Sequence, residues 1–437
     1  MRKNILLILA WLICLPSMAQ KKQIDDANYR RSSLHLVLIT TDDPILKEPV
    51  VMNSWDNYPF PDKYNSHSIS LKKFSAGKPG VSFFEFATKY VSGEYRLPNS
   101  IIALKKIQED TDNKAYTKAL IEKIQEKIQE EKIAHQLLEK WFKIQPDGTC
   151  SMDLIKERGC YNATEMQALE ASKTQRGRVL LEDAGEELIG NTFIQFCKLD
   201  FYENEPIERF RLMIANAIIT LATAGEIKES AAAKIAYDVR KDGYSARAQA
   251  MLYKLNWNDS IMAEFYNCWI DENKLDYEKF QSLPFNMVLV GTDVSTSSAI
   301  APFGLKLDEK KLINLTVVRN IDKLFAVMQA KYEVFKPKFP VLTNPPLTAA
   351  FGMKEGLKGG EQFELLETIW NEKTNKREYK RIGIVKVNKK QIWDNRYNAG
   401  ETPENHQINK KTGEPVTATL LTKNKVAYPG MLLRQIK

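Results

Sequence analysis

The stretch LIGNTFIQFCKLDF, residues 188–201, decides the fold because its hydrophobic pattern changes from helical to extended. Gly190 is suited to end a helix in the left-handed conformation, and the apolar and aromatic residues after it predict a strand over residues 192–201. Further along the chain the pattern predicts helices at 210–224, 226–239 and 259–272 and strands at 244–257 and 286–292. This irregular alternation favours an α+β fold over a doubly wound sheet.

Upstream of this stretch, residues 34–40 are β-branched enough to predict a buried strand, and residues 83–95 follow helical spacing. A longer helical pattern covers residues 115–142, with Glu/Lys pairs on its polar face. An oligomerising coiled coil is the alternative interpretation. The apolar seam fails at Glu131 and Lys132, so we favour a helix packed on its own domain.

The C-terminal part differs in character, because a Pro-rich segment at 341–350 is followed by short predicted strands and tight turns. Strands at 362–370 and 377–387, bent around several glycines, predict a small SH3-like β-barrel. The sequence therefore divides into a signal peptide at 1–19, a loop-rich and helical region at 20–145, an α+β body at 146–344, and the barrel with its tail at 345–437.

The N-terminus resembles a cleaved secretory signal. Arg2 and Lys3 precede an apolar stretch at 5–15, and Ser17 and Ala19 are small residues at the positions that a signal peptidase requires. An uncleaved membrane anchor is the alternative. We expect an exported protein, periplasmic or associated with the outer membrane. Removal of residues 1–19 lowers the formal net charge of +8 by the two charges of Arg2 and Lys3, to +6.

The basic residues form no single-sign patch, because Lys and Arg are interleaved with Glu throughout the chain. Nucleic acid is therefore not an expected partner. The apolar run 212–222 is about half as long as a membrane span requires. We expect a buried helix there, with peripheral membrane contact through residues 210–224 as the alternative.

Motifs of several chemistries are missing. The sequence has no CxxC, no HExxH, no G-x-S-x-G and no phosphate-binding loop, so it predicts neither a metal site nor a cofactor. A disulfide between Cys150 and Cys160 is compatible with an oxidising compartment, whereas Cys197 and Cys268 are typical of small core residues.

The aromatic residues of the C-terminal region offer a candidate binding surface. On an SH3-like barrel they would line a shallow groove for an extended peptide or a cell-wall fragment, with one acidic and one basic residue at its rim. Side-chain alternation along a strand would place some of them in the core instead. The candidate groove residues are Trp370, Tyr379, Trp393 and Tyr397, with Asp394 and Arg396 at the rim.

Four segments carry a resemblance to a known group of proteins: residues 183–193 (DAGEELIGNTF), 252–260 (LYKLNWNDS), 352–356 (GMKEG) and 392–396 (IWDNR). The chain resembles a family of uncharacterised exported proteins from Bacteroidetes-type bacteria over about residues 150–400. The resemblance implies export to a bacterial cell envelope and implies no activity.

Two functions are consistent with these patterns. The first is an exported cell-envelope protein with a binding, interaction or structural role. Its partner would be an envelope protein or a cell-wall component. We expect no enzymatic activity in this case. The alternative is a hydrolase acting on envelope or dietary polymers, with its site between the body and the C-terminal barrel. A deep polar cleft with close carboxylates at that junction would favour the hydrolase.

Overall fold

The structure is a computed structural model, which describes residues 33–42, 47–58, 64–66, 69–77, 114–155, 188–223, 229–300, 308–371, 376–396, 408–409 and 413–436. Helices and sheets are mixed along the chain, as expected for an α+β protein. The expected signal peptide, the predicted helix at 83–95 and Cys160 lie outside the described residues.

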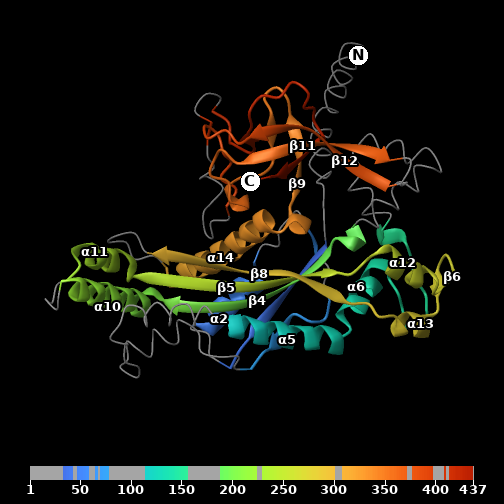
Figure 1. The fold of residues 1–437 in the computed structure, drawn as a ribbon, viewed down its shortest axis with the longest axis horizontal. Coiled ribbons are helices and arrows are strands. Elements are labelled where there is room, and N and C mark those ends of the chain that lie inside the picture. The colour runs from blue at the N-terminus through green and yellow to red at the C-terminus, as the bar shows by residue number, and fades with distance from the viewer. Residues whose placement is uncertain are drawn as a thin grey trace, which may run out of the picture.

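A six-stranded sheet forms the centre of the body (Figure 1). Its strands are β1 (Ser33–Thr40), β2 (Asn65–Ser66), β3 (Lys73–Ser75), β4 (Thr192–Glu203), β5 (Gly243–Leu255) and β8 (Met287–Ile300). The order is β2-β1-β4-β5-β8, with β3 also on the outer side of β1. β1 and β4 run parallel, whereas β4, β5 and β8 are antiparallel neighbours. The first eight residues of β4 are all buried, because helices cover both faces of this central strand.

One face of the sheet is covered by α2 (Glu48–Asp56) and by α14 (Glu309–Lys331), which is followed by the short helix η1 (Glu333–Phe335). Phe193, Cys197 and Phe201 of β4 point into this core, where they meet Val317 and Phe325 of α14. Cys197 is thus a buried core residue, as the sequence predicted.

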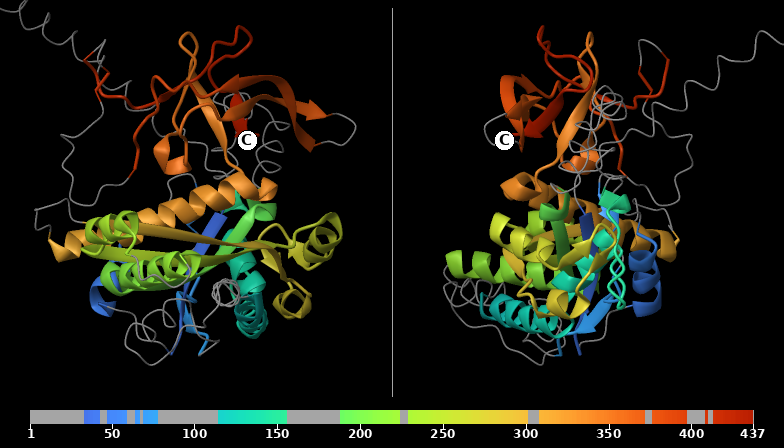
Figure 2. Two further views of the ribbon diagram at one scale, coloured as in Figure 1. Left: turned by 60° about the vertical axis from the view of Figure 1, so that its left-hand side comes forward. Right: turned by 90° about the vertical axis from the view of Figure 1, so that its right-hand side faces the viewer.

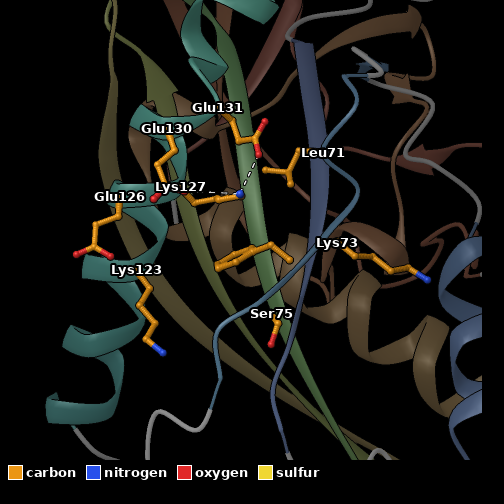
Figure 3. Close-up of a pocket in the computed structure, with 9 residues that line it drawn as sticks. Leu71, Lys73, Ser75, Lys123, Glu126, Lys127, Glu130 and Glu131 are labelled. Carbon is orange, nitrogen blue, oxygen red and sulfur yellow. Dashed lines mark ion pairs between the residues drawn. The ribbon is translucent and has the colours of Figure 1, made fainter.

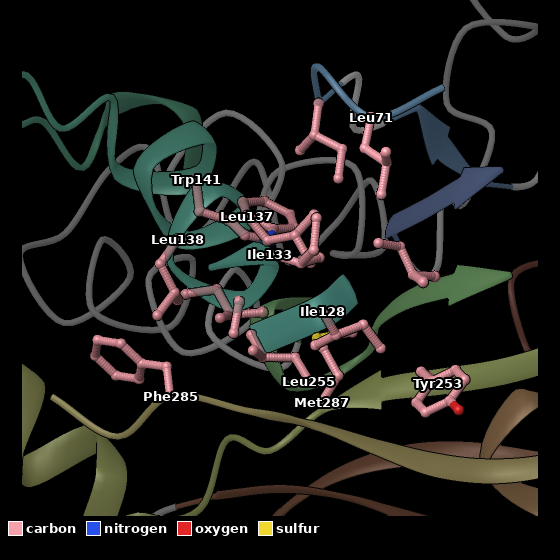
Figure 4. Close-up of a cluster of buried hydrophobic side chains, with 14 of the residues drawn as sticks. Leu71, Ile128, Ile133, Leu137, Leu138, Trp141, Tyr253, Leu255, Phe285 and Met287 are labelled. Carbon is pink, nitrogen blue, oxygen red and sulfur yellow. The ribbon is translucent and has the colours of Figure 1, made fainter. Parts of the chain in front are cut away.

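The other face carries a large hydrophobic cluster, part of which is shown in Figure 4. It is covered by α5 (Lys114–Glu130), α6 (Ile133–Phe142), α12 (Asp259–Tyr266), α13 (Tyr277–Ser282) and the small hairpin of β6 (Trp269–Asp271) and β7 (Lys274–Leu275). Cys150 and Cys268 are buried free thiols in this cluster, so Cys150 is not in a disulfide.

Three predicted elements differ from those observed. The helix predicted over 115–142 is two helices, because Lys132 adopts a left-handed conformation with φ of 47° between α5 and α6. The helix predicted over 259–272 ends at Tyr266, and its last residues form β6. The strand predicted over 286–292 extends to Ile300, since the Ser/Thr-rich residues after it pair with β5.

β4 and β5 are connected by two antiparallel helices, α10 (Asn204–Ala222) and α11 (Ala231–Arg240), at one end of the sheet (Figure 1). In the part of the chain that the structure describes, no helix is both long and apolar enough to cross a membrane.

A second six-stranded sheet, which we call the C-terminal module (residues 338–436), lies beyond α14 (Figure 2). Its strands are β9 (Lys338–Thr343), β10 (Thr348–Ala349), β11 (Gln362–Asn371), β12 (Lys376–Lys386), β13 (Thr419–Leu420) and β14 (Leu432–Gln435), and the short helix η2 (Met353–Glu355) follows β10. Phe351 stacks on Phe363 (ring centroids 4.7 Å apart) and contacts the tilted ring of Phe339 (4.8 Å) in a separate core. The predicted boundary at residue 345 falls inside this sheet, because β9 pairs with β14.

The strands that the structure describes in the C-terminal module form no closed barrel, in contrast to the closed SH3-like barrel expected from the sequence. The sheet order is β12-β11-β14-β9-β10-β13, so β12 and β13 are its ends. The two ends meet at an isolated bridge between Val387 and Leu421, supported by hydrogen bonds from Asn388 N to Leu420 O (2.9 Å) and from Thr422 N to Lys386 O (2.8 Å).

Candidate functional site at the junction of body and module

The junction between the body and the C-terminal module is centred on Asp322 of α14, a carboxylate that is 7% exposed. It accepts a hydrogen bond from the Tyr58 hydroxyl (2.7 Å) and pairs with Lys354 Nζ of η2 (3.7 Å). Burial raises the pKa of Asp322, although Lys354 and Tyr58 act in the opposite direction, and the nearby Glu355 raises it further. A helix of the body and a turn of the module therefore share one buried charge.

The neighbouring Glu355 orders the module side of this junction. Its Oε2 accepts from Gly352 N (2.6 Å) and from Asn395 Nδ2 (2.9 Å), and Asn395 Oδ1 accepts from Lys354 N (2.8 Å). A Cβ at Gly352 would lie 2.1 Å from the backbone oxygen of Trp393, so only glycine fits this close approach. The segment after β12 is thereby held against η2.

Three of the six predicted groove residues lie in that segment. Trp393 is half-buried, and its backbone bridges Gly352 and donates to Thr419 Oγ1 (3.0 Å). Asp394 and Arg396 form a two-bonded ion pair (2.8 and 2.6 Å), which holds the pKa of Asp394 below its usual range, and Arg319 of α14 adds to this effect. The two residues that the sequence places at the rim of the groove thus form an ion pair close to Arg319 of α14.

The other three are placed elsewhere. Tyr379 is on β12 opposite Thr368, with its ring 3.7 Å from Nζ of Lys338 on β9. The backbone of Trp370 pairs with Arg377 in the same β11–β12 hairpin. Tyr397 lies outside the described residues. No contact in the described parts links Tyr379 to Trp393, so the structure gathers the predicted residues into two separate places.

A second ion-pair cluster ties the module to the end of the body. Arg434 of β14 pairs with Glu333 of η1 (3.1 Å) and with Glu364 of β11. Glu333 also binds Lys336 (2.7 Å), which lowers the pKa of Glu333 more than Arg434 does. The module is therefore attached to the body at two places: η2 contacts α14 through Lys354 and Asp322, and β14 contacts η1 through Arg434 and Glu333.

Sequence reasoning missed Asp322, Tyr58 and Lys354. Asp322 had a detectable signal, since it is an acidic residue within the apolar periodicity of residues 312–328 and such residues are rarely buried unless paired. Tyr58 and Lys354 had no such signal, because their contacts with Asp322 bring together three segments that are distant in the sequence.

The body holds an open groove of about 550 Å³ between α5 and β3 (Figure 3). Leu71 and Phe74 form part of its lining, and the rest is charged or polar. Lys127 pairs with Glu131 (2.8 Å) and Glu130 (3.7 Å), which raises the pKa of Lys127, and Lys123 Nζ donates to Ala76 O. These lysines are thus occupied by the protein itself, and no group of three metal-ligating side chains is found among the described residues.

A buried ion pair on β4 also escaped the sequence reasoning. Lys198, 4% exposed, binds Asp200 and lies 5.2 Å from the ring centre of Tyr116. Burial opposes the charge of Lys198, but Asp200 and Tyr116 outweigh it and raise the pKa of Lys198. A lysine charge held this way is typical of a structural ion pair.

The α10–α11 pair exposes apolar side chains. The expected buried helix at 210–224 is wrong beyond Phe210, because no described side chain from residue 211 onward in α10 is buried and Met213 and Ile218 are about 40% exposed. In α11 no residue is buried, and Ile235 and Val239, one turn apart, are 65% and 50% exposed. The apolar face of α11 therefore points away from the protein.

The chain matches no protein-family model. A search of curated proteins finds no match to it either.

Proposed function

We propose that the protein is exported to the cell envelope and acts there by binding, with the body and the C-terminal module forming one scaffold. The observation that carries this proposal is the use of the junction carboxylates as ties. Asp322, Glu333 and Glu355 each bind a cation, a backbone N–H or an amide across or beside the junction. Carboxylates that are bound to protein groups in this way stabilise the contact between the body and the module.

The binding surface that we propose is on the C-terminal module. We also propose that this module is SH3-like. The bridge between Val387 and Leu421, which brings β12 and β13 together around a single core, supports this. The half-buried Trp393 and the Asp394–Arg396 pair next to η2 offer one aromatic face and two charges to an extended peptide or cell-wall fragment.

A hydrolase with its site at the junction is the second candidate. The observation that favours it is the buried Asp322, whose pKa is raised and whose neighbour is a second carboxylate, Glu355. A carboxylic acid with a raised pKa is suited to donate a proton. The pairing of Asp322 with Lys354 and Tyr58 ranks this function below binding.

Peripheral contact with a membrane through residues 210–224 is a further part of the proposal. The outward apolar face of α11 and the half-exposed apolar residues of α10 support it. Arg209 and Arg211 are paired with Glu205 and Glu208 on α10, so attraction to anionic lipid would not rest on these arginines.

Fractionation of the native cell tests the proposal. We expect the mature protein to begin at Gln20 and to be found in the envelope fraction. Purified protein is expected to sediment with isolated envelope or cell-wall material. Arg396→Ala should weaken this sedimentation. Lys425→Ala, a change at an exposed residue elsewhere on the module, should leave it unchanged. A mature protein that starts at Met1 in the cytosolic fraction contradicts export. Turnover of glycosides, esters or peptides that is lost in Asp322→Asn would establish the hydrolase instead.

A further inference from the structure

β8 is an edge strand of unusual length. It has 14 residues, and in the described chain only β5 pairs with it, so its outer side faces no strand. The opposite edge of the sheet is formed by β2 and β3, which have two and three residues. Long unpaired edges are templates for another extended chain, and proteins usually protect them with lysine, proline or a bulge.

The direction of the backbone groups of β8 follows from two side-chain contacts. Tyr332 Oη donates to Thr292 O (2.8 Å), and Lys323 Nζ donates to Thr296 O (2.8 Å). In an antiparallel ladder, alternate residues direct both their N–H and their C=O to the same side. The N–H and C=O groups of Val294, Thr296 and Ser298 therefore point away from β5.

The sequence of this edge favours pairing. Residues 294–300, VSTSSAI, contain no charge, no proline and no glycine. The register shift of β8 lies at the other end, near Gly291, so residues 294–300 pair regularly with β5. Among the described residues, the side chains that bond to this edge are Tyr332 at Thr292 and Lys323 at Thr296.

The side chains next to the edge differ on the two faces of the sheet. Ser295 and Ser297 bond to Asn320 and Thr316 of α14, so odd-numbered residues face α14. Val294 and Ile300, on the other face, are 38% and 37% exposed. A strand added here would place alternate side chains beside these apolar residues and the rest beside α14, where the Lys323 ammonium lies.

We propose that the edge of β8 at residues 294–300 binds an extended segment of a partner protein, in which β-branched residues alternate with acidic ones. The incoming N–H replaces the Lys323 ammonium at Thr296 O, and the displaced ammonium then pairs with a carboxylate of the added strand. A second copy of this chain fits less well, because two-fold pairing centred on Thr296 brings Lys323 against its own copy. This proposal rests on the proposed binding function and assigns it a site in the body.

The test uses the mature protein and an acetylated nine-residue peptide that alternates valine with glutamate, labelled for fluorescence anisotropy. We expect saturable binding, about threefold to fivefold tighter than that of the same peptide with glutamine, because an exposed ion pair contributes up to about this factor. Lys323→Met is expected to remove the difference between the two peptides. Lys311→Met, an exposed lysine elsewhere on α14, should preserve it.

Peptide backbone chemistry provides a control that does not depend on the folding of a variant. The glutamate peptide with alternate amide nitrogens methylated keeps its side chains but cannot donate to the strand, so we expect its binding to be lost. Equal binding of the methylated peptide, or an unchanged glutamate preference in Lys323→Met, overturns the proposal. The proposal is also overturned if the protein dimerises with increasing concentration and Ser298→Pro abolishes this dimerisation, because a second copy of the chain would then occupy the edge of β8.

The two proposals can fail separately. Loss of peptide binding with export and envelope sedimentation intact removes the β8 site only. Cytosolic protein that still binds the peptide removes the proposed envelope function only.

Discussion

Helices α6 and α11 have the same length of ten residues and both have an apolar face, yet their surroundings are opposite. α6 buries seven residues, whereas α11 buries none. Phe142 at the end of α6 meets Phe265 of α12 at 4.5 Å and Trp269 of β6 at 5.9 Å. α11 packs chiefly on α10, which is itself half-exposed. Amphipathicity alone therefore does not determine burial, because the partner surface comes from distant segments.

The largest effect is expected at Trp141 of α6. Its ring is fully buried, and its indole N–H donates to Thr192 Oγ1 at the start of β4 (2.8 Å). Trp141→Ala leaves a cavity and removes the indole N–H that Thr192 Oγ1 accepts, so it should lower the free energy of unfolding by about 3–5 kcal/mol. Ile235→Ala on α11 is the matched control and should change it by less than about 0.5 kcal/mol. Urea unfolding followed by circular dichroism measures both, and equal losses would contradict the contrast between the helices.

The stability of the core around α6 should depend on pH through a buried histidine. His135 of α6 contacts the rings of Phe280 and Phe285 edge-on. Burial, with a smaller effect of Lys132, lowers the pKa of His135 to about 4. The unfolded chain, with an ordinary histidine pKa near 6.5, binds the proton more readily, so stability is lost as pH falls from about 6.5 toward 4. The full loss is about 3 kcal/mol. Denaturant titrations at pH 7, 5.5 and 4.5 measure it.

His135→Leu is the control for the pH effect, since it removes the titrating group and keeps an apolar side chain in the cluster. The variant should lose much of the decline in stability between pH 6.5 and 4. The same pH dependence in His135→Leu as in the parent protein would show that other groups, chiefly carboxylates, cause the loss.

The sequence predicts local structure well and partner surfaces poorly. The strands β1, β4, β5, β11 and β12 were predicted close to their observed ranges, because their period and composition are local properties. The exposure of α10 was not predicted, since an apolar helix has the same sequence whether or not another layer covers it. In the candidate site, Asp394 and Arg396 are two residues apart, so one sequence segment brings them together. The contact of Asp322 with Lys354 depends instead on how the module packs on α14, which no local pattern encodes.

A smaller effect is expected at the start of each helix. Ser230 caps α11, accepting a hydrogen bond from Ala233 N (3.2 Å), whereas α6 begins after Lys132 without a side-chain cap. Because α11 has no buried face to hold it, Ser230→Ala should cost about 1 kcal/mol of local stability. Hydrogen exchange should speed up in residues 231–240 and remain unchanged in α6. Unchanged exchange in α11 would show that contacts with α10 hold the helix.

The smallest effect on stability and the clearest effect on location are expected at Ile235 of α11. Because this side chain is 65% exposed, Ile235→Asp should change the free energy of unfolding by less than about 0.5 kcal/mol. If α11 lies on a membrane, the same change places a charge in the apolar interface and should release the protein from vesicles of phosphatidylethanolamine and phosphatidylglycerol. Lys234→Gln, a neighbouring polar change, serves as the control in vesicle sedimentation. A variant that is destabilised by several kcal/mol would mean that α11 is packed as α6 is, and an equally bound variant would place the membrane contact elsewhere.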